Sequence, residues 1–169
     1  MDKNVEIKQE PKNKFIQFYN QNKIKFLVLI FLIILIAFSI IFINQNNKKK
    51  NEKIAEKYVQ AGIYLSNNKE KEATIMFEEI ILNKNKFYSI LALNTIIEKN
   101  LIKQEEKILN YFEILENLNY SDEKSDLITF KKALFFMKIS KDKEGKELLK
   151  KLIKNKSKLK KLAEEIILN

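Results

Sequence analysis

The chain lacks cysteine, histidine, tryptophan and arginine among its 169 residues, so all 32 basic residues are lysine. Without thiols or imidazoles the sequence excludes disulfides, Cys/His zinc sites, a cysteine nucleophile and a histidine base for a serine triad. It also has only two glycines and one proline. Because tight turns between strands depend on those residue types, this scarcity favours an all-α protein.

The carboxylates form no catalytic constellation. Adjacent acids occur in three places, Glu78/Glu79, Glu105/Glu106 and Glu164/Glu165. Neighbouring residues on a helix point about 100° apart, so such pairs do not converge on one substrate atom. The chain also has no glycine-rich phosphate loop and no metal-ligand spacing. We therefore expect no enzyme, no catalytic or metal-binding residue, no cofactor and no small-molecule substrate.

One apolar run dominates what the sequence does contain. FLVLIFLIILIAFSIIFI, from Phe26 to Ile43, has no charge and only Ser39 as a polar side chain. As a helix it extends roughly 27 Å, close to the hydrocarbon thickness of a bilayer. We expect a tail at 1–25, a transmembrane anchor at 26–43, a linker at 44–53 and a helical domain at 54–169.

A run of this kind has two other common interpretations, a buried core helix and a cleaved signal peptide. A buried core helix in a small chain would have a polar face, whereas this run is apolar on all sides. A cleaved signal peptide would have a shorter head, an apolar region of about 7–15 residues and a small-x-small cleavage site. The nearest small residues, Ala37 and Ser39, lie inside the run. The retained anchor is therefore the prediction.

Lysines flank the run on both sides and do not decide its orientation. Those within 15 residues are Lys12, Lys14, Lys23 and Lys25 before it, and Lys48, Lys49, Lys50, Lys53 and Lys57 after it. Large domains translocate largely regardless of charge. We therefore expect a cytoplasmic N-terminus and an exported C-terminal domain.

Apolar residues recur at helical spacing throughout the remaining chain. They predict seven short helices after the anchor, joined by polar loops, with Ser121 or Asp122 capping the fifth and Asp142 capping the sixth. The stripes begin at Ile54, Ala73, Phe87, Ile108, Leu127, Leu148 and Leu159. No single pair of such helices can bury its own stripe, so a stack of antiparallel pairs with a C-terminal capping helix is expected.

An internal repeat supports this stack. The matched residues are 72 positions apart and are Ala61/Ala133, Tyr64/Phe136, Ala73/Gly145, Phe77/Leu149 and Ile80/Leu152. Small residues suit the closest approach of two helices, and bulky ones fill the space beside it. The spacing resembles the tetratricopeptide repeat. The middle unit departs from it because Gln104 stands at a small position. The alternative is an irregular helical bundle.

The whole arrangement resembles a known family. The lysine-bearing tail KFIQFYNQNKIKF (14–26), one transmembrane helix, a degenerate tetratricopeptide domain and the terminal KLAEEIIL (161–168) look like the ancillary subunit of the bacterial Sec translocon. The resemblance implies an inner-membrane protein with a periplasmic helical domain. It also implies association with the Sec channel, periplasmic chaperones or exported polypeptides, and no enzymatic activity.

Stacked helix pairs line a concave surface with the first helix of each pair, where a partner segment can lie. On the repeat register, the groove residues would be Tyr58, Gly62, Leu65, Phe130, Leu134 and Met137. Ordinary core packing is the alternative for each of them. For the protein as a whole, the alternative is a structural membrane scaffold or self-associating adaptor.

Charge is uneven along the domain. Residues 131–161 carry 13 lysines against three acids, whereas residues 44–130 are close to balanced. Such a surface is either a solvated face or a contact for anionic lipid or acidic protein segments. Nucleic acid is not an expected partner because the chain has no arginine for bidentate base contacts and no recognised binding module.

Overall fold

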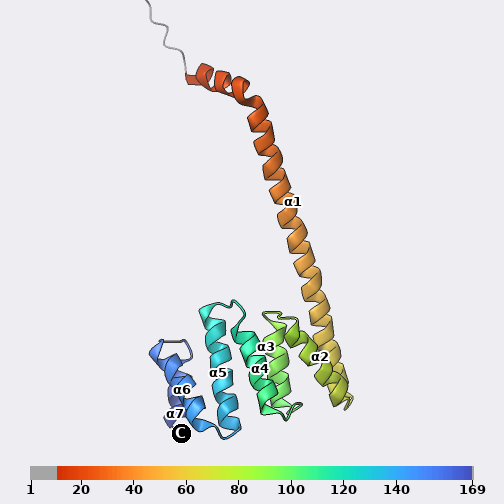
Figure 1. Cartoon of the computed structure of the whole chain (residues 1–169), viewed down its shortest axis with the longest axis vertical. Helices are drawn as coiled ribbons and strands as arrows, with labels where there is room; N and C mark the ends of the chain where they lie inside the picture. Colours follow the sequence, from red (N-terminus) through yellow and green to blue (C-terminus); the bar gives the residue numbers. More distant parts are fainter. Residues whose placement is uncertain (1–10, 169) are drawn as a thin grey trace, which may run out of the picture. The chain divides into compact units, whose positions relative to one another are not determined.

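The computed structural model describes residues 11–168, with side chains from residue 21 onward, and is helical with no strand in that range (Figure 1). The predicted all-α class is confirmed. Residues 1–10 of the predicted tail and Asn169 lie outside the described residues. The helices are α1 (Pro11–Ser66), α2 (Glu70–Leu82), α3 (Tyr88–Glu98), α4 (Glu105–Glu116), α5 (Asp122–Lys138), α6 (Asp142–Lys154) and α7 (Lys160–Leu168).

Helix α1 is 56 residues long and contains both the apolar run and the first apolar stripe of the domain. The sequence predicted a separate helix near Ile54, but the structure continues one helix through residues 44–53. These ten residues contain neither glycine nor proline, so no residue there favours a helix end. Proline at position 11 fits the first turn, where its missing N–H is not needed.

The chain divides into two compact units, residues 1–49 and residues 50–169. In the first unit, the side chains from Leu27 to Ile43 are all exposed, and none of the run is buried by protein. The hydroxyl of Ser39 donates to the carbonyl of Leu35 at 2.9 Å, so the one polar side chain is satisfied within the helix. This helix is long and apolar enough to cross a membrane.

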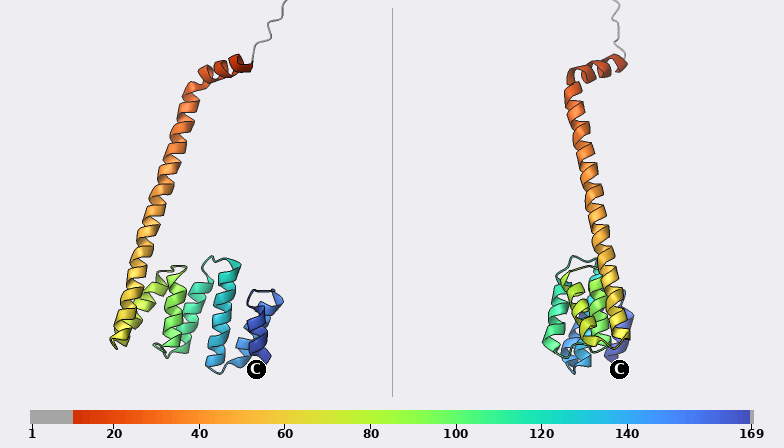
Figure 2. Two further views of the ribbon diagram at one scale, coloured as in Figure 1. Left: turned by 180° about the vertical axis from the view of Figure 1, so that it is seen from behind. Right: turned by 90° about the vertical axis from the view of Figure 1, so that its right-hand side faces the viewer.

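In the second unit the helices lie side by side (Figure 2) and enclose two hydrophobic clusters. The larger cluster takes buried residues from α1 to α5, including Ala61, Phe77, Ile96 and Phe112. The smaller one joins α5, α6 and α7 through Ala133, Leu149, Leu152 and Ala163.

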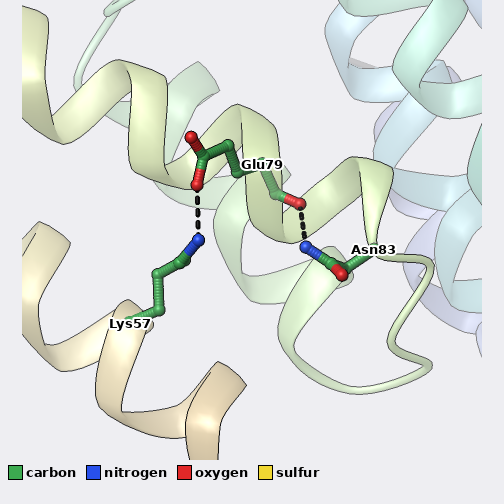
Figure 3. Close-up of polar contacts among 3 residues, drawn as sticks. All are labelled: Lys57, Glu79 and Asn83. Carbon is green, nitrogen blue, oxygen red and sulfur yellow. Dashed lines mark hydrogen bonds and ion pairs between the residues drawn. The ribbon is translucent and has the colours of Figure 1, made fainter. Parts of the chain in front are cut away.

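Three contacts join the domain part of α1 to α2 and the loop after it. The Lys57 ammonium pairs with the Glu79 carboxylate (Figure 3), the Tyr58 and Phe77 rings lie 5.6 Å apart, and the Asn85 amide donates to Asn51 at 2.7 Å. Figure 3 also shows the Asn83 amide donating to the backbone carbonyl of Glu79, at 2.8 Å. The same carbonyl also accepts from the backbone N–H of Asn83 at 2.9 Å, so Asn83 closes the end of α2 with two hydrogen bonds.

The backbone repeats itself at the same 72-residue spacing as the sequence. Asn68 and Ser140 have φ of 58° and 60°, and Lys84 and Lys156 have φ of 57° and 53°. Helices α2 and α6 are both 13 residues long and begin 72 positions apart. The hydrogen bond from the Lys69 N–H to the Tyr64 carbonyl, 2.9 Å, recurs from Lys141 to Phe136 at 2.8 Å. The segment from the end of α1 through α2 and the segment from the end of α5 through α6 therefore fold alike.

The paired residues that define the sequence repeat are buried to matching extents. Tyr64 and Phe136 are half-buried at the ends of α1 and α5, and the other four pairs are buried, namely Ala61/Ala133, Ala73/Gly145, Phe77/Leu149 and Ile80/Leu152. Gln104, the residue that departs from the pattern, is exposed and precedes α4 as its N-cap. A polar side chain is acceptable there because it does not enter the packed interface.

One of the two predicted caps occupies its expected position. Ser121 occupies the N-cap position of α5, but its side chain makes no capping hydrogen bond. Asp142 was predicted to cap α6, whereas it is the first helical residue and Lys141 is the N-cap. An acid in the first turn instead interacts favourably with the positive end of the helix dipole.

The two glycines provide a matched test of packing. A Cβ at Gly145 would lie 2.7 Å from Cγ of Met137 and 2.8 Å from the carbonyl oxygen of Ala133, whereas one at Gly62 would meet nothing within 4 Å. Gly145→Ala should therefore destabilise the domain by about 1–3 kcal/mol. Gly62→Ala should stabilise it by about 0.5–1 kcal/mol, because alanine favours a helix interior. Thermal unfolding of the purified full chain, followed by circular dichroism, checks both; equal melting temperatures would contradict the close approach.

Candidate partner-binding surface

Tyr58 of α1 contacts two other helices. Its hydroxyl lies 3.2 Å from that of Thr95 in α3, and its ring lies 5.6 Å from Phe77 of α2 and 5.7 Å from Tyr88 of α3. The side chain is half-buried against the larger cluster. In this conformation Tyr58 joins α1 to α2 and α3, and only part of it is available to a partner.

The other predicted groove residues lie in different surroundings. Leu65 packs against the larger cluster, while Phe130 and Met137 pack against the smaller one. Gly62 is exposed, and Leu134 is 39% exposed. The six residues therefore divide between the two clusters and the surface. Their role in a groove stays a prediction.

Sequence reasoning missed a cavity of about 390 Å³ at the ends of α3 and α5. The loop from Asn100 to Lys103 forms one side of it, and Ser140 of the loop after α5 forms another. Ile102, Ile108 and Phe135, which also line it, are buried. It has an apolar floor, but its accessible lining is mainly polar and comes from the rim. No sequence motif marks it, because its lining comes from two separate segments, residues 97–108 and 135–140.

The rim of this cavity is basic. The Lys138 ammonium donates to the backbone carbonyl of Ile97 at 2.7 Å, and Lys103 has no partner among the described residues. Glu105 is the acid in the lining, and it pairs with Lys141 at 3.1 Å. The two lysines keep their charge facing the cavity, so the site favours a ligand that carries a carboxylate beside an apolar group.

Helix α6 presents a second basic surface. Lys143, Lys150 and Lys154 are exposed, and no ion pair involves them within the part of the chain that the structure describes. On the opposite side of the helix, Leu149 and Leu152 are buried. The predicted basic segment is thus an amphipathic helix whose charged face meets solvent.

Tyr111 of α4 forms a polar link to α2. Its hydroxyl donates to Glu78 at 2.8 Å, and the same carboxylate pairs with Lys107. Burial raises the pKa of the Tyr111 hydroxyl well above its usual value, and the Glu78 hydrogen bond and charge raise it further. This network holds α2 against α4 and does not activate a nucleophile.

Over residues 21–168, no group of three or more acidic side chains is arranged to hold a metal ion. The described residues include the cavity, the exposed basic face of α6 and the exposed apolar helix. No family model, curated protein or solved structure matches the chain.

Two tyrosines with different surroundings test the polar link. Tyr111→Phe removes a bond to a charged acceptor and should cost about 1–2 kcal/mol. The Tyr120 hydroxyl is buried without a hydrogen-bond partner among the described residues, so Tyr120→Phe should be neutral or slightly stabilising.

Alkaline pH provides a second test of the Tyr111 hydrogen bond. The stabilising contribution of neutral Tyr111 is present below the unfolded pKa of about 10 and is lost as pH rises above it. Unfolding of the wild type should therefore become easier above pH 10 by a larger margin than that of Tyr111→Phe. Parallel pH profiles for the two proteins would contradict the assignment.

Proposed function

We propose that this chain is a single-pass membrane protein whose helical domain binds protein partners. The observation that carries the proposal is the complete exposure of the apolar run from Leu27 to Ile43 within a helix that continues into a packed domain. Exposed apolar surface of this length is strongly unfavourable in water and favourable in lipid. Its lack of burial by protein also argues against a soluble core helix.

The domain is proposed to be a tetratricopeptide-like stack of antiparallel helix pairs. In support, contacts join Asn51 to Asn85 and Lys57 to Glu79, on either side of the turn at 67–69. Residues that move away from a turn in both directions and still meet are what antiparallel packing produces. The Glu123–Lys158 pair has the same relation to the turn at 139–141.

The proposed partners are the Sec channel and the chaperones or exported polypeptides near it. This part of the proposal rests on the sequence resemblance, with the domain in the periplasm and the N-terminus in the cytoplasm. The cavity at the ends of α3 and α5 supplies a place where a partner side chain can enter. An apolar side chain would contact Phe135 and Ile108, and an adjacent carboxylate would meet Lys103 or Lys138.

A structural scaffold is the second candidate, and one feature favours it. Val59 and Ile63, one helical turn apart on α1, are 60% and 46% exposed, and Gly62 beside them has open space around it. An apolar stripe with room for close approach suits packing against a second copy of the same helix. This alternative places the functional surface on α1 and leaves the cavity without a role.

Topology can be tested by labelling, because the chain has no cysteine of its own. Single cysteines at Asn13 and Asn67 would be probed with a membrane-impermeant maleimide in intact spheroplasts. We expect Asn67→Cys to react at once and Asn13→Cys to react only after permeabilisation. The reverse pattern would place the domain in the cytoplasm.

Photo-crosslinking discriminates the adaptor from the scaffold. A crosslinking amino acid at Asn100, on the cavity rim, should capture Sec channel subunits, and the same probe at Lys150 of α6 serves as an exposed control. The same crosslinking amino acid at Val59 tests the scaffold alternative. Self-crosslinks from Val59 with no channel adduct from Asn100 would favour the scaffold.

A further inference from the structure

The loop between α2 and α3 presents lysines and large apolar side chains together. Leu82 and Phe87 are 57% and 56% exposed, and Lys84 and Lys86 between them are also exposed. We call these four residues the Leu82–Phe87 surface. No hydrogen bond or ion pair occupies either ammonium group in the part of the chain that the structure describes.

Local bonds keep this loop in one conformation. The Asn85 carboxamide oxygen accepts from the backbone N–H groups of Phe87, at 3.0 Å, and Tyr88, at 2.9 Å. The Phe87 ring packs edge-on against Tyr88 at 5.0 Å, and Tyr88 in turn contacts Tyr58. Phe87 is therefore exposed on an ordered support, and burying it elsewhere would break these contacts.

The same loop is bound to the part of α1 nearest the apolar run. Asn85 donates to Asn51, which lies eight residues after Ile43 in the sequence. Eight residues extend at most about 28 Å, and about 12 Å when helical. The loop therefore stays within that reach of the point where the chain leaves the apolar run. Lys50 and Lys53, which flank Asn51, are exposed and add to the local positive charge.

We propose that the Leu82–Phe87 surface docks on the anionic lipid headgroups of the bilayer that the apolar run crosses. The inference rests on the proposed membrane crossing. Lysines near an anionic leaflet are attracted to it, and their aliphatic stems tolerate the interface. Phe87 and Leu82 enter the boundary between headgroups and acyl chains, as apolar side chains of peripheral segments do. Docking would orient the domain and limit its rotation about α1.

The test uses the full chain reconstituted into vesicles of phosphatidylcholine, with or without about one third phosphatidylglycerol. A single cysteine replaces Leu82 and carries an environment-sensitive fluorophore, with Asn67→Cys as the reference position at the other end of α2. We expect blue-shifted emission and quenching by spin-labelled lipid at position 82 only, in the anionic vesicles only. Salt at about 1 M should abolish both, because the Debye length falls to roughly 3 Å.

A charge variant with a matched control measures how much Lys84 and Lys86 contribute to docking. Each lysine near an anionic surface strengthens its attraction about fivefold, so Lys84→Gln with Lys86→Gln should lower the docked-to-undocked ratio roughly 30-fold. Lys143→Gln with Lys150→Gln, the same change on exposed residues of α6, should leave the ratio unchanged. Equal losses in the two variants would overturn specific docking of this loop.

Two further outcomes separate this proposal from the one it rests on. If the protein stays in the vesicles after alkaline extraction but the probe at position 82 remains in water, docking is refuted and the membrane crossing stands. If alkali releases the protein, the crossing fails and the docking fails with it.

Discussion

The folded domain depends on close approach between successive helices at small residues. Gly145 lets α6 pack so tightly on α5 that a single added carbon would reach the Ala133 carbonyl. Ala61 and Ala73 hold the equivalent places in the first hairpin and are fully buried. With the backbones this near, Phe77 and Leu149 fill the space beside each contact. A left-handed residue recurs in the turn after α1, at Asn68, and in the turn after α5, at Ser140.

The two parts of α1 have different surroundings. The side chains of α1 from Leu27 to Ile43 are all exposed, while the part from Ile54 onward contributes Tyr58 and Ala61 to a core. No helix-breaking residue separates the two parts, so the change is one of side chains only. Within the domain, the Asn85 bond to Asn51 links the α2–α3 loop to the beginning of the packed part of α1. Lysines and apolar side chains gather at that place.

The sequence predicted the helical class because apolar spacing is a local property, and it predicted the repeat because similar residues recur at a fixed interval. Apolar spacing reports a helix, and matched residues 72 positions apart report matched packing, as the burial of Ala133 and Ala61 illustrates. The predicted helix ends and N-cap residues were less accurate. Residues 44–53 look like a linker by polarity, yet a polar stretch without glycine or proline can remain helical. At Asp142, a good capping side chain fell one position inside the helix.

Composition and pattern alone thus sufficed for the apolar span, the all-helical class and the basic C-terminal segment, since each is written in neighbouring residues. They also sufficed for the repeat, which appears when residues 72 positions apart are compared. The surroundings of Tyr58, the cavity floored by Ile102 and Phe135, and the ordered exposure of Phe87 came only from packing. Each brings together side chains from helices and loops distant in the sequence. Burial and hydrogen bonding between such segments follow from how the helices cross, and that geometry has no local signature.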